Sequence, residues 1–576
     1  MIALTGLAGL HAGLGLAAIQ IPQINYTPLL PVLILTGGAI VLMAVGSLVV
    51  RTLKPAESAA ITAGFSVAAL IASIILWHDV TARGGLTAVA KAITVDGFTA
   101  LFMILVCVAL ILSAMYGEGY LNREGLGGTE YFALAMLSGS GAILMAEAAD
   151  LIVVFLGLEI LSIALYVLAG IDHRRPSSGE AAMKYFVLGA FSSAIFVYGI
   201  ALTYGATGST NIAQIGSFLA NNPSSTNGLL LAGSGLMLVG FLFKVAAVPF
   251  HMWTPDVYQG SPTPVTGFMA AVAKAGGFAA LIRVFLEAFP TLRDSWQPLV
   301  LWVAVLTLLA GAVLAIVQSD IKRMLAYSSI NHAGFILLGL QAASSSGVAG
   351  SVYYLFVYSV MVIGTFGLIA FISKKGDNDH SLERYRGLAR EHPVVALSLT
   401  ILLIAQAGIP FTTGFLAKFY VLAAAISAHS YALAVVAMVS AAIATFFYLR
   451  VVALMYAGSL SLGRGRGART ASEPLVEVND EPVAELVGVG VGGGPLAIFP
   501  ASGSFLAAYG EDGDVLNADD EPSSESAPEI AAVVGPALVL PPAARVATAL
   551  CLGVTVVFGV WPQPLFDLAH SATLLF

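Results

Sequence analysis

The chain has 576 residues, of which 58% are hydrophobic and only 10% are charged, and its formal net charge is −8. Soluble domains carry about 25% charged residues. This composition, with a mean hydropathy of +0.91, therefore excludes an ordinary soluble protein and indicates one that crosses a membrane many times. The two cysteines, Cys107 and Cys551, are fewer than the about four thiolates that an iron–sulfur cluster needs, and they support no disulfide framework.

A spanning helix needs about 20 mostly apolar residues. On that criterion the predicted fold class is an all-α polytopic membrane protein with about 14 transmembrane helices. The predicted spans are approximately 28–50, 58–77, 97–117, 131–147, 150–170, 181–204, 229–250, 264–288, 298–318, 325–343, 348–372, 394–427, 431–456 and 544–570. Residues 1–27 are apolar but broken by Gly and Pro, so we expect a separate N-terminal segment ahead of the first three spans in 28–130.

Lysine and arginine counts predict the orientation, because cytoplasmic connections retain an excess of these residues. The connections after odd-numbered spans hold 17 basic residues, including the flanking Arg450 and Arg545, whereas the opposite side holds 3. We therefore expect a multi-pass protein of the bacterial plasma (inner) membrane with both termini on the outer side.

The connection at 457–541, ahead of the last span in 542–576, differs in composition from the rest of the chain. It is rich in Gly and Pro and contains 13 acidic residues against 3 basic ones. We predict a mostly disordered, acidic cytoplasmic insertion. Its negative charge argues against nucleic acid and anionic lipid as partners of this segment.

Five basic residues that belong to no connection lie inside the predicted spans, and one carboxylate lies near the middle of a span; a charge at such a depth costs roughly 2.5–3.5 kcal/mol on insertion scales. They are Glu159, Lys184, Lys244, Lys274, Arg283 and Lys418. Glu159 and Lys244 are predicted partners, with opposite signs and deep positions on different helices. A buried pair that only fixes helix packing is the alternative, but ionisable residues at this depth usually mark ion pathways. The same argument favours a functional role for Lys274 and Lys418.

The evidence for a functional role is weaker for Lys184, Arg283 and His332. Lys184 lies near the cytoplasmic end of its span, where a proton-carrying role and a snorkelling side chain are equally compatible with the sequence. Arg283, near the outer end of its span, is expected to be a snorkelling anchor. His332 is a candidate for proton transfer, because imidazole titrates near neutral pH, and equally for a hydrogen-bonded packing residue.

The choice of lysine favours proton relay over simple anchoring. Burial favours the neutral amine and a nearby carboxylate favours the charged form, so a buried lysine beside a glutamate can gain and lose a proton. Arginine stays protonated and could not serve.

Prolines interrupt two of the spans that carry these lysines. Pro249 breaks the seventh span after Lys244, and Pro410 breaks the twelfth span ahead of Lys418. In lipid such breaks are tolerated only where protein or a water-filled cavity satisfies the freed backbone groups. The two breaks are five spans apart. They predict two inverted five-helix repeats, spans 4–8 in 131–288 and spans 9–13 in 298–456.

Several stretches resemble one known family. They are LGLEILSIALYVLAG, EAAMKYFVLGAFSSAIFVYG, GFLFKVAAVPFHMWTPDVYQGSPTPV, QSDIKRMLAYSSINHAGFILLG, QAGIPFTTGFLAKFYVLAA and, in the last span, VVFGVWPQPLFDL. Together they closely resemble the antiporter-like subunits of proton-pumping NADH-quinone oxidoreductase, respiratory complex I. The resemblance covers about residues 28–456 and the last span. The lysine in GFLAKFY and the absence of a long helix after the last span are most similar to subunit N.

The resemblance implies a proton-translocating subunit in the membrane arm of that enzyme. The family's Glu–Lys pair would correspond to Glu159 and Lys244, its central lysine to Lys274 and its distal lysine to Lys418. Lys184 would be an accessory residue. The resemblance also implies that this chain binds no cofactor, and that FMN, iron–sulfur clusters and quinone lie on partner subunits. Its partners would be other membrane-arm subunits, the lipid bilayer and protons.

Two other functions remain as alternatives. A subunit of a multisubunit cation/proton antiporter shares the same ancestry and predicts sodium–proton exchange without redox partners. A structural membrane scaffold with vestigial charges predicts neither activity.

Overall fold

The computed structural model describes residues 25–48, 53–222, 228–458 and 539–572, and every structural statement here concerns these ranges. The predictions for the segment 1–27 and for the acidic insertion 457–541 fall almost entirely outside them.

The first part of the chain forms six long helices. They are α1 (Leu30–Leu48), α2 (Pro55–Arg83), α3 (Gly97–Glu124), α4 (Thr129–Glu147), α5 (Leu151–Ala169) and α6 (Pro176–Thr207). Asp96 and Asp150 accept backbone N–H groups at the starts of α3 and α5, which is the usual role of an N-cap aspartate. A short antiparallel hairpin, β1 (Leu86–Ala88) and β2 (Ile93–Val95), joins α2 to α3 and was not predicted.

The middle of the chain is more interrupted. Its helices are α7 (Ile212–Asn221), α8 (Gly228–Lys244), α9 (Trp253–Gly260) and α10 (Thr263–Arg283), and α10 continues into a π-helical turn (Val284–Ala288) and a 3-10 turn (Pro290–Leu292). The short helices α7 and α9 were not predicted, because neither is long enough to give a hydropathy signal.

The last part contains the remaining helices and one more 3-10 turn (Leu382–Tyr385). The helices are α11 (Arg293–Ile316), α12 (Ile321–Ala342), α13 (Ser345–Ile372), α14 (Leu388–Glu391), α15 (Pro393–Ala407), α16 (Thr413–Ser427), α17 (Tyr431–Tyr456), α18 (Pro542–Val560) and α19 (Gln563–Ser571).

Each predicted span contains a helix, and the prediction of a helical, multi-pass membrane protein is confirmed. Among the described residues, eleven helices are long and apolar enough to cross a membrane, and α8, α15 and α16 are shorter apolar helices. The count of about fourteen spans and the two inverted repeats stay predictions. The last span was expected to be continuous over 544–570, but Pro562 separates α18 from α19.

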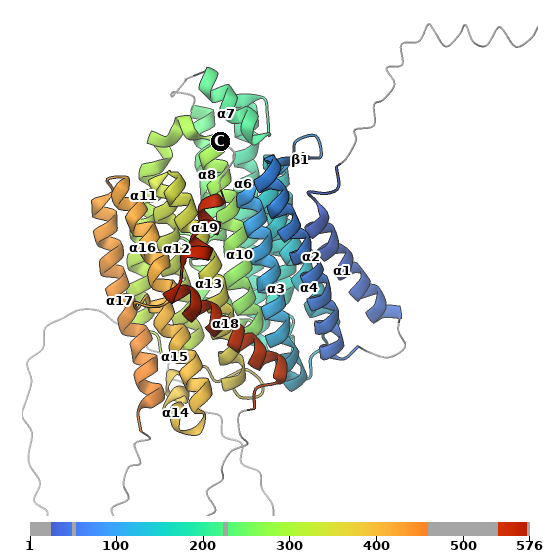
Figure 1. Cartoon of the computed structure of the whole chain (residues 1–576), viewed down its shortest axis with the longest axis vertical. Helices are drawn as coiled ribbons and strands as arrows, with labels where there is room; N and C mark the ends of the chain where they lie inside the picture. The colour runs from blue at the N-terminus through green and yellow to red at the C-terminus, as the bar shows by residue number, and fades with distance from the viewer. Residues whose placement is uncertain (1–24, 49–52, 223–227, 459–538, 573–576) are drawn as a thin grey trace, which may run out of the picture. The chain divides into compact units, whose positions relative to one another are not determined.

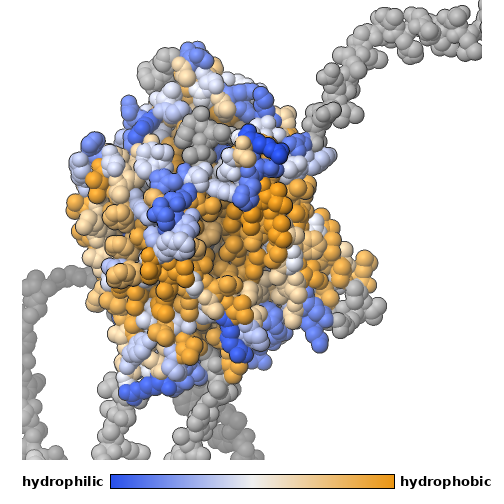
Figure 2. All heavy atoms as spheres, viewed as in Figure 1, coloured by the Kyte–Doolittle hydropathy of each residue, from blue (hydrophilic) through white to orange (hydrophobic). Residues whose placement is uncertain are grey.

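The centre of the bundle is formed by α10 and α13, which pack against each other (Figure 1). Every residue of α10 is buried, whereas only about a third of the apolar stretches of α1, α2 and α18 is buried. The outer surface shows a broad apolar zone between two polar ends (Figure 2). This distribution is the one expected of a helix bundle in a bilayer, with a protein core around α10.

Both predicted helix breaks are present. Helix α8 ends at Lys244, five residues before Pro249, so the break begins earlier than the proline. The backbone N–H of Val248 in this break donates to Thr307 Oγ1 at 3.0 Å, which satisfies one of the freed groups. The second break separates α15 from α16, where Gly408 has a φ of +86°.

Candidate functional site

Lys244 is the last residue of α8 and lies in the protein interior, with 4% of its surface exposed. Its Nζ donates to Ser162 Oγ at 2.7 Å, and the Tyr185 hydroxyl lies 3.5 Å away. A cavity of about 10 Å³ adjoins these groups, which is room for about one water molecule. The buried ammonium group is therefore held by hydroxyls and has space for a water beside it.

Glu159 lies on α5, one helical turn before Ser162, and is partly buried. Its Oε1 has no hydrogen-bond partner among the described residues. Within the same ranges no ion pair shorter than 4 Å joins Glu159 to Lys244, so Ser162 is the direct partner of the lysine. Glu159 and Lys244 thus lie in the same neighbourhood, on either side of Ser162, without a direct contact.

Lys274 occupies the middle of α10 and is 3% exposed. Its Nζ donates to the backbone carbonyl of Ser329 on α12 and lies 5.7 Å from the centre of the Tyr358 ring. The Ser329 hydroxyl accepts from Tyr358 at 2.8 Å and lies 3.4 Å from the Tyr258 hydroxyl. Lys274 therefore meets a group of hydroxyls rather than a carboxylate.

His332 lies one turn after Ser329 on α12 and is 2% exposed. Its Nδ1 is 2.7 Å from the Tyr354 hydroxyl and its Nε2 is 3.1 Å from the Tyr448 hydroxyl. Both ring nitrogens are thus engaged, and the imidazole bridges two helices, α13 and α17. Which nitrogen carries the proton in the neutral ring depends on the direction of these two bonds.

The Tyr448 hydroxyl joins His332 to the second helix break. It also hydrogen-bonds with Ser328 Oγ and donates to Gln406 Oε1 at 3.5 Å. Gln406 lies directly before Ala407, the last residue of α15, and the Ala407 carbonyl accepts from Lys418 Nζ at 2.6 Å. Polar groups therefore extend from the neighbourhood of His332 to Lys418 on α16.

Gly408 makes room for the Lys418 side chain. A β-carbon at this position would lie 2.8 Å from Lys418 Cδ and 3.2 Å from its Nζ, and the positive φ also favours glycine. Lys418 is 5% exposed and its Nζ lies 5.0 Å from the centre of the Phe335 ring.

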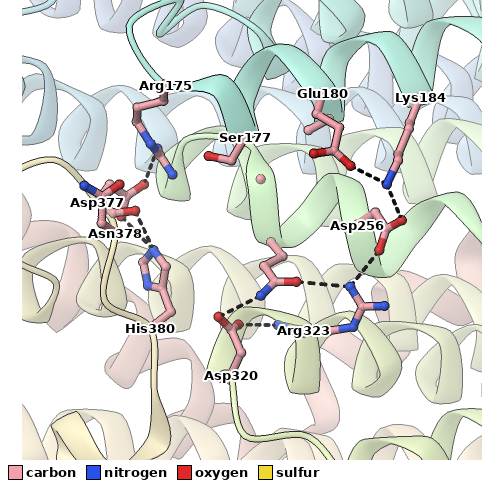
Figure 3. A pocket seen from close by; sticks show the side chains of 13 residues that line it. Arg175, Ser177, Glu180, Lys184, Asp256, Asp320, Arg323, Asp377, Asn378 and His380 are labelled. Carbon is pink, nitrogen blue, oxygen red and sulfur yellow. Dashed lines mark hydrogen bonds and ion pairs between the residues drawn. The ribbon is translucent and has the colours of Figure 1, made fainter. Parts of the chain in front are cut away.

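Lys184 is separate from this interior group and lies at the rim of a polar cavity of about 390 Å³ (Figure 3). It pairs with Glu180 at 2.6 Å and with Asp256 at 2.9 Å, and 41% of its side chain is exposed. Arg323 pairs with the other oxygen of Asp256 at 2.6 Å. Burial alone would raise the pKa of Asp256, but Lys184 and Arg323 outweigh it and hold that pKa below its usual value.

The prediction of a snorkelling Arg283 is wrong. Its guanidinium is 1% exposed, pairs with Asp96 at 2.9 Å and Glu287 at 2.9 Å, and donates to the Ala146 carbonyl and the Thr99 hydroxyl. The sequence pattern could not show this, because Asp96 lies nearly 190 positions earlier in the chain and reaches Arg283 only through the packing of α3 against α10.

Asp377, in the segment after α13, forms a second buried charge cluster that the sequence did not indicate. Its carboxylate pairs with Arg175 at 3.1 Å and accepts from the Tyr120 hydroxyl at 3.0 Å and the Thr263 backbone N–H at 3.0 Å. The cluster ties the adjacent ends of α3, α6 and α10 to α13. Asp377 is fully buried.

The lysines of the candidate site were therefore found from the sequence, whereas their hydroxyl and carbonyl partners were missed. Serines and tyrosines are common in membrane helices, and only the rotation of one helix against another decides which of them face a lysine. The one available signal was the polar stretch YSSINH, which contains Ser328, Ser329 and His332.

A comparison with protein families matches this arrangement to a known class. The model of the family described as "NADH:quinone oxidoreductase/Mrp antiporter, TM" matches residues 148–444, which include both helix breaks and all the buried lysines. The fold and the site thus define an antiporter-like membrane subunit.

Two relatives identify the family within this class of membrane subunits. The chain is 40% identical over 443 residues to NADH-quinone oxidoreductase subunit N of Chloroflexus aggregans, covering 76% of this chain and 89% of the relative. It is 44% identical over 367 residues to the subunit N of Trichlorobacter lovleyi, covering 64% and 75%. The chain belongs to the NADH-quinone oxidoreductase subunit N family.

Solved structures agree with this assignment. A chain of the respiratory complex I from Thermus thermophilus with bound aureothin superposes with a TM-score of 0.69 and 27% sequence identity. The alignment covers 94% of this chain and 99% of that one, so the likeness extends over the whole fold.

Proposed function

We propose that the chain carries protons through the membrane arm of an NADH-quinone oxidoreductase, along a relay formed by Glu159, Lys244, Lys274, His332 and Lys418. The observation that carries this proposal is the row of buried polar groups, each bonded to its neighbours in short clusters, that extends from the central lysine to the second helix break. Charged and polar groups in a membrane interior are costly, and such a set has no role in anchoring.

The contacts suggest how a proton would move. Lys244 can give up a proton when the charge on Glu159 changes, because the nearby carboxylate stabilises the ammonium form. Ser329 and Tyr358 offer hydroxyls beside Lys274, and His332 can accept on one ring nitrogen while it donates from the other. Protonation at one end of such a chain releases a proton at the other end.

Lys418 is proposed as the exit-side residue of the relay. Its ammonium is held by the carbonyl at the end of α15, and the helix break leaves that carbonyl without an intrahelical partner. Loss of the proton from Lys418 would complete one transfer toward the outer side, with Lys184 as an accessory on the cytoplasmic side.

The electron chemistry is assigned to partner subunits. FMN, iron–sulfur clusters and quinone are proposed to lie there, with this chain in contact with other membrane-arm subunits and with lipid. The orientation, with both termini outside the bacterial inner membrane, rests on the distribution of lysine and arginine.

A cation/proton antiporter subunit is the second candidate, because the matching family model is described for both systems. The two functions differ in a measurable way. The first requires NADH oxidation to drive proton movement, and the second gives sodium–proton exchange in vesicles without NADH.

Replacement of one lysine tests the proposal. Lys244→Ala, expressed in native membranes, should reduce NADH-driven acidification of inverted vesicles at least about 10-fold while the complex stays assembled. Lys375→Ala removes an exposed lysine and is the matched control. Unchanged pumping by an intact Lys244→Ala complex would refute the relay.

A further inference from the structure

The polar cavity beside Lys184, called the vestibule, is lined by residues that, apart from Lys184, have no part in the relay above. It has a volume of about 390 Å³ and lies between α6, α9, α12 and the segment after α13 (Figure 3). It opens at the end of the bundle that the positive charges assign to the cytoplasm.

Most of the charges that line the vestibule are paired with one another, and Asp320 accepts hydrogen bonds from Gln259 and from the Arg323 backbone N–H. Asp256 is shared by Lys184 and Arg323, and on the opposite side Arg175 pairs with Asp377 (Figure 3). A ligand ion would have to compete with these existing pairs. Water molecules can occupy the cavity without displacing these ion pairs, and a cavity of this size holds on the order of ten of them.

Helix α9 separates the vestibule from the relay. Gln259 and Gly260 line the vestibule, whereas the neighbouring Tyr258 is 2% exposed and lies on the interior side. The hydroxyl of Tyr258 lies 3.4 Å from Ser329 Oγ, and the carbonyl of that same serine holds Lys274. A single short helix thus lies between the cavity and the central lysine.

Two buried hydroxyls at the ends of α9 point to water in this wall. Thr254 Oγ1 and Ser261 Oγ are both fully buried, and neither has a hydrogen-bond partner within the described ranges. Ser261 directly follows Gly260, at the floor of the vestibule. Buried polar atoms without protein partners are the usual sites of ordered internal water.

We propose that the vestibule is the place where the relay takes up protons, and that Tyr258 is the hydroxyl that passes them to Ser329 and Lys274. This inference rests on the proposed function. In the transfer, the Tyr258 oxygen receives a proton from vestibule water as its own proton leaves toward Ser329 Oγ, and the Ser329 hydroxyl in turn gives up its proton to a neutral Lys274 amine. Both hydroxyls are unchanged afterwards, and the vestibule water recovers a proton from the cytoplasmic solution.

Blocking the vestibule tests its role. Ser177 lines it, is exposed, and can be replaced by cysteine with little change in volume. In inverted vesicles, a membrane-impermeant, positively charged methanethiosulfonate reagent should label the Ser177→Cys complex and reduce NADH-driven pumping at least about 10-fold. Asn122→Cys, exposed at the end of α3, is the control and should keep its pumping after labelling.

Two results of this experiment would overturn the proposal. One is complete labelling of Ser177→Cys with unchanged pumping. The other is failure of the reagent to label from the cytoplasmic side, because an uptake vestibule must be open to that solution. Labelling is verified by the mass of the modified subunit.

Removal of one hydroxyl tests the link through α9. Tyr258→Phe keeps the ring and should reduce pumping at least about 10-fold without loss of assembly. Tyr353→Phe is the matched control, since Tyr353 is equally buried but its hydroxyl has no partner in the described structure. Equal pumping by the two variants would refute the role of Tyr258.

The outcomes separate this inference from the proposed function. If Lys274→Ala abolishes pumping while labelled Ser177→Cys and Tyr258→Phe pump normally, the relay stands and the uptake site is elsewhere. If Lys274→Ala also pumps normally, the relay itself is wrong.

Discussion

The ammonium group of Lys418 donates a 2.6 Å hydrogen bond to the carbonyl of Ala407, across the break between α15 and α16. Lys244 is placed in a related way, as the last residue of α8 at the first break. The C-terminal end of a helix carries partial negative charge and free carbonyl groups. At both breaks a buried lysine bonds a group that is not a carboxylate: Lys418 bonds the Ala407 carbonyl at the end of α15, and Lys244 bonds the Ser162 hydroxyl on the neighbouring α5.

This relationship predicts the effect of Gly408→Ala. The new β-carbon would lie 2.8 Å from Lys418 Cδ, and alanine at a φ of +86° adds a strain of about 1–3 kcal/mol. We expect Lys418 to lose its bond to Ala407 and NADH-driven pumping to fall, as measured by acidification of inverted vesicles.

The matched control is Gly235→Ala on α8, where a β-carbon meets no other atom within 4 Å. It should leave pumping and assembly unchanged. If Gly408→Ala behaves like this control, the space beside Lys418 is not needed for transfer.

Ser162→Ala tests the direct partner of Lys244. The substitution removes the hydroxyl 2.7 Å from the ammonium group and leaves only Tyr185, at 3.5 Å. A buried charge with too few partners is costly, so the proton affinity of Lys244 should change and pumping should fall about 10-fold.

Ser138→Ala is the comparison for Ser162→Ala. Ser138 is equally buried, and its hydroxyl bonds only the Leu161 carbonyl, at 3.4 Å. A similar loss of pumping in both variants would mean that the effect comes from helix packing rather than from Lys244.

Tyr448→Phe should interrupt the relay between His332 and the second helix break. The hydroxyl contacts His332 Nε2 at 3.1 Å, Gln406 at 3.5 Å and Ser328 Oγ, and phenylalanine keeps the ring but loses all three bonds. We expect pumping to fall at least about 10-fold at an unchanged amount of assembled complex. Tyr116→Phe, which loses a bond of 2.9 Å to Thr548 away from the relay, should pump normally. Normal pumping by Tyr448→Phe would exclude this tyrosine from the path.

Hydropathy and charge were sufficient to predict the spans, the two breaks and the deeply buried lysines. Each of these is a local property: an apolar run, a proline, or a charge where lipid disfavours one. The partners of Lys274 and Lys418 were not predictable in this way. Ser329 and Ala407 reach these lysines through the rotation and depth of neighbouring helices, which one sequence does not encode as a local pattern.

Arg283 is a residue for which the sequence-based prediction was wrong. Its position near the outer end of a span predicted a side chain that reaches water, but Asp96 and Glu287 hold it in the interior. A long basic side chain near a membrane surface snorkels unless a buried carboxylate is within reach. The spacing of four residues places Glu287 within reach of Arg283, whereas the approach of Asp96 follows only from the packing of α3 against α10.

Asp377→Asn tests the buried charge cluster that joins α3, α6, α10 and α13. Asparagine removes the negative charge and leaves Arg175 and Lys322 without their counter-charge, at 3.1 and 3.9 Å. Breaking a buried ion pair costs about 3–5 kcal/mol. The solubilised complex should therefore unfold at a lower temperature. Asp379→Asn, two residues on and bonded mainly to its own turn at Ser381, should have little effect.

The pH dependence of the same variant follows from the pKa of Asp377. Burial alone would raise this pKa, but Lys322, His380 and Arg175 outweigh burial and hold it well below its usual range. A carboxylate with a lowered pKa stabilises the fold at every pH above its ordinary value of about 3.9, and this stability is lost only as the pH falls through the lowered value. Asp377→Asn should thus unfold at a lower temperature than the parent throughout about pH 5 to 8. A difference that disappears within that range would mean that Asp377 is protonated in the folded complex and does not hold these helices by its charge.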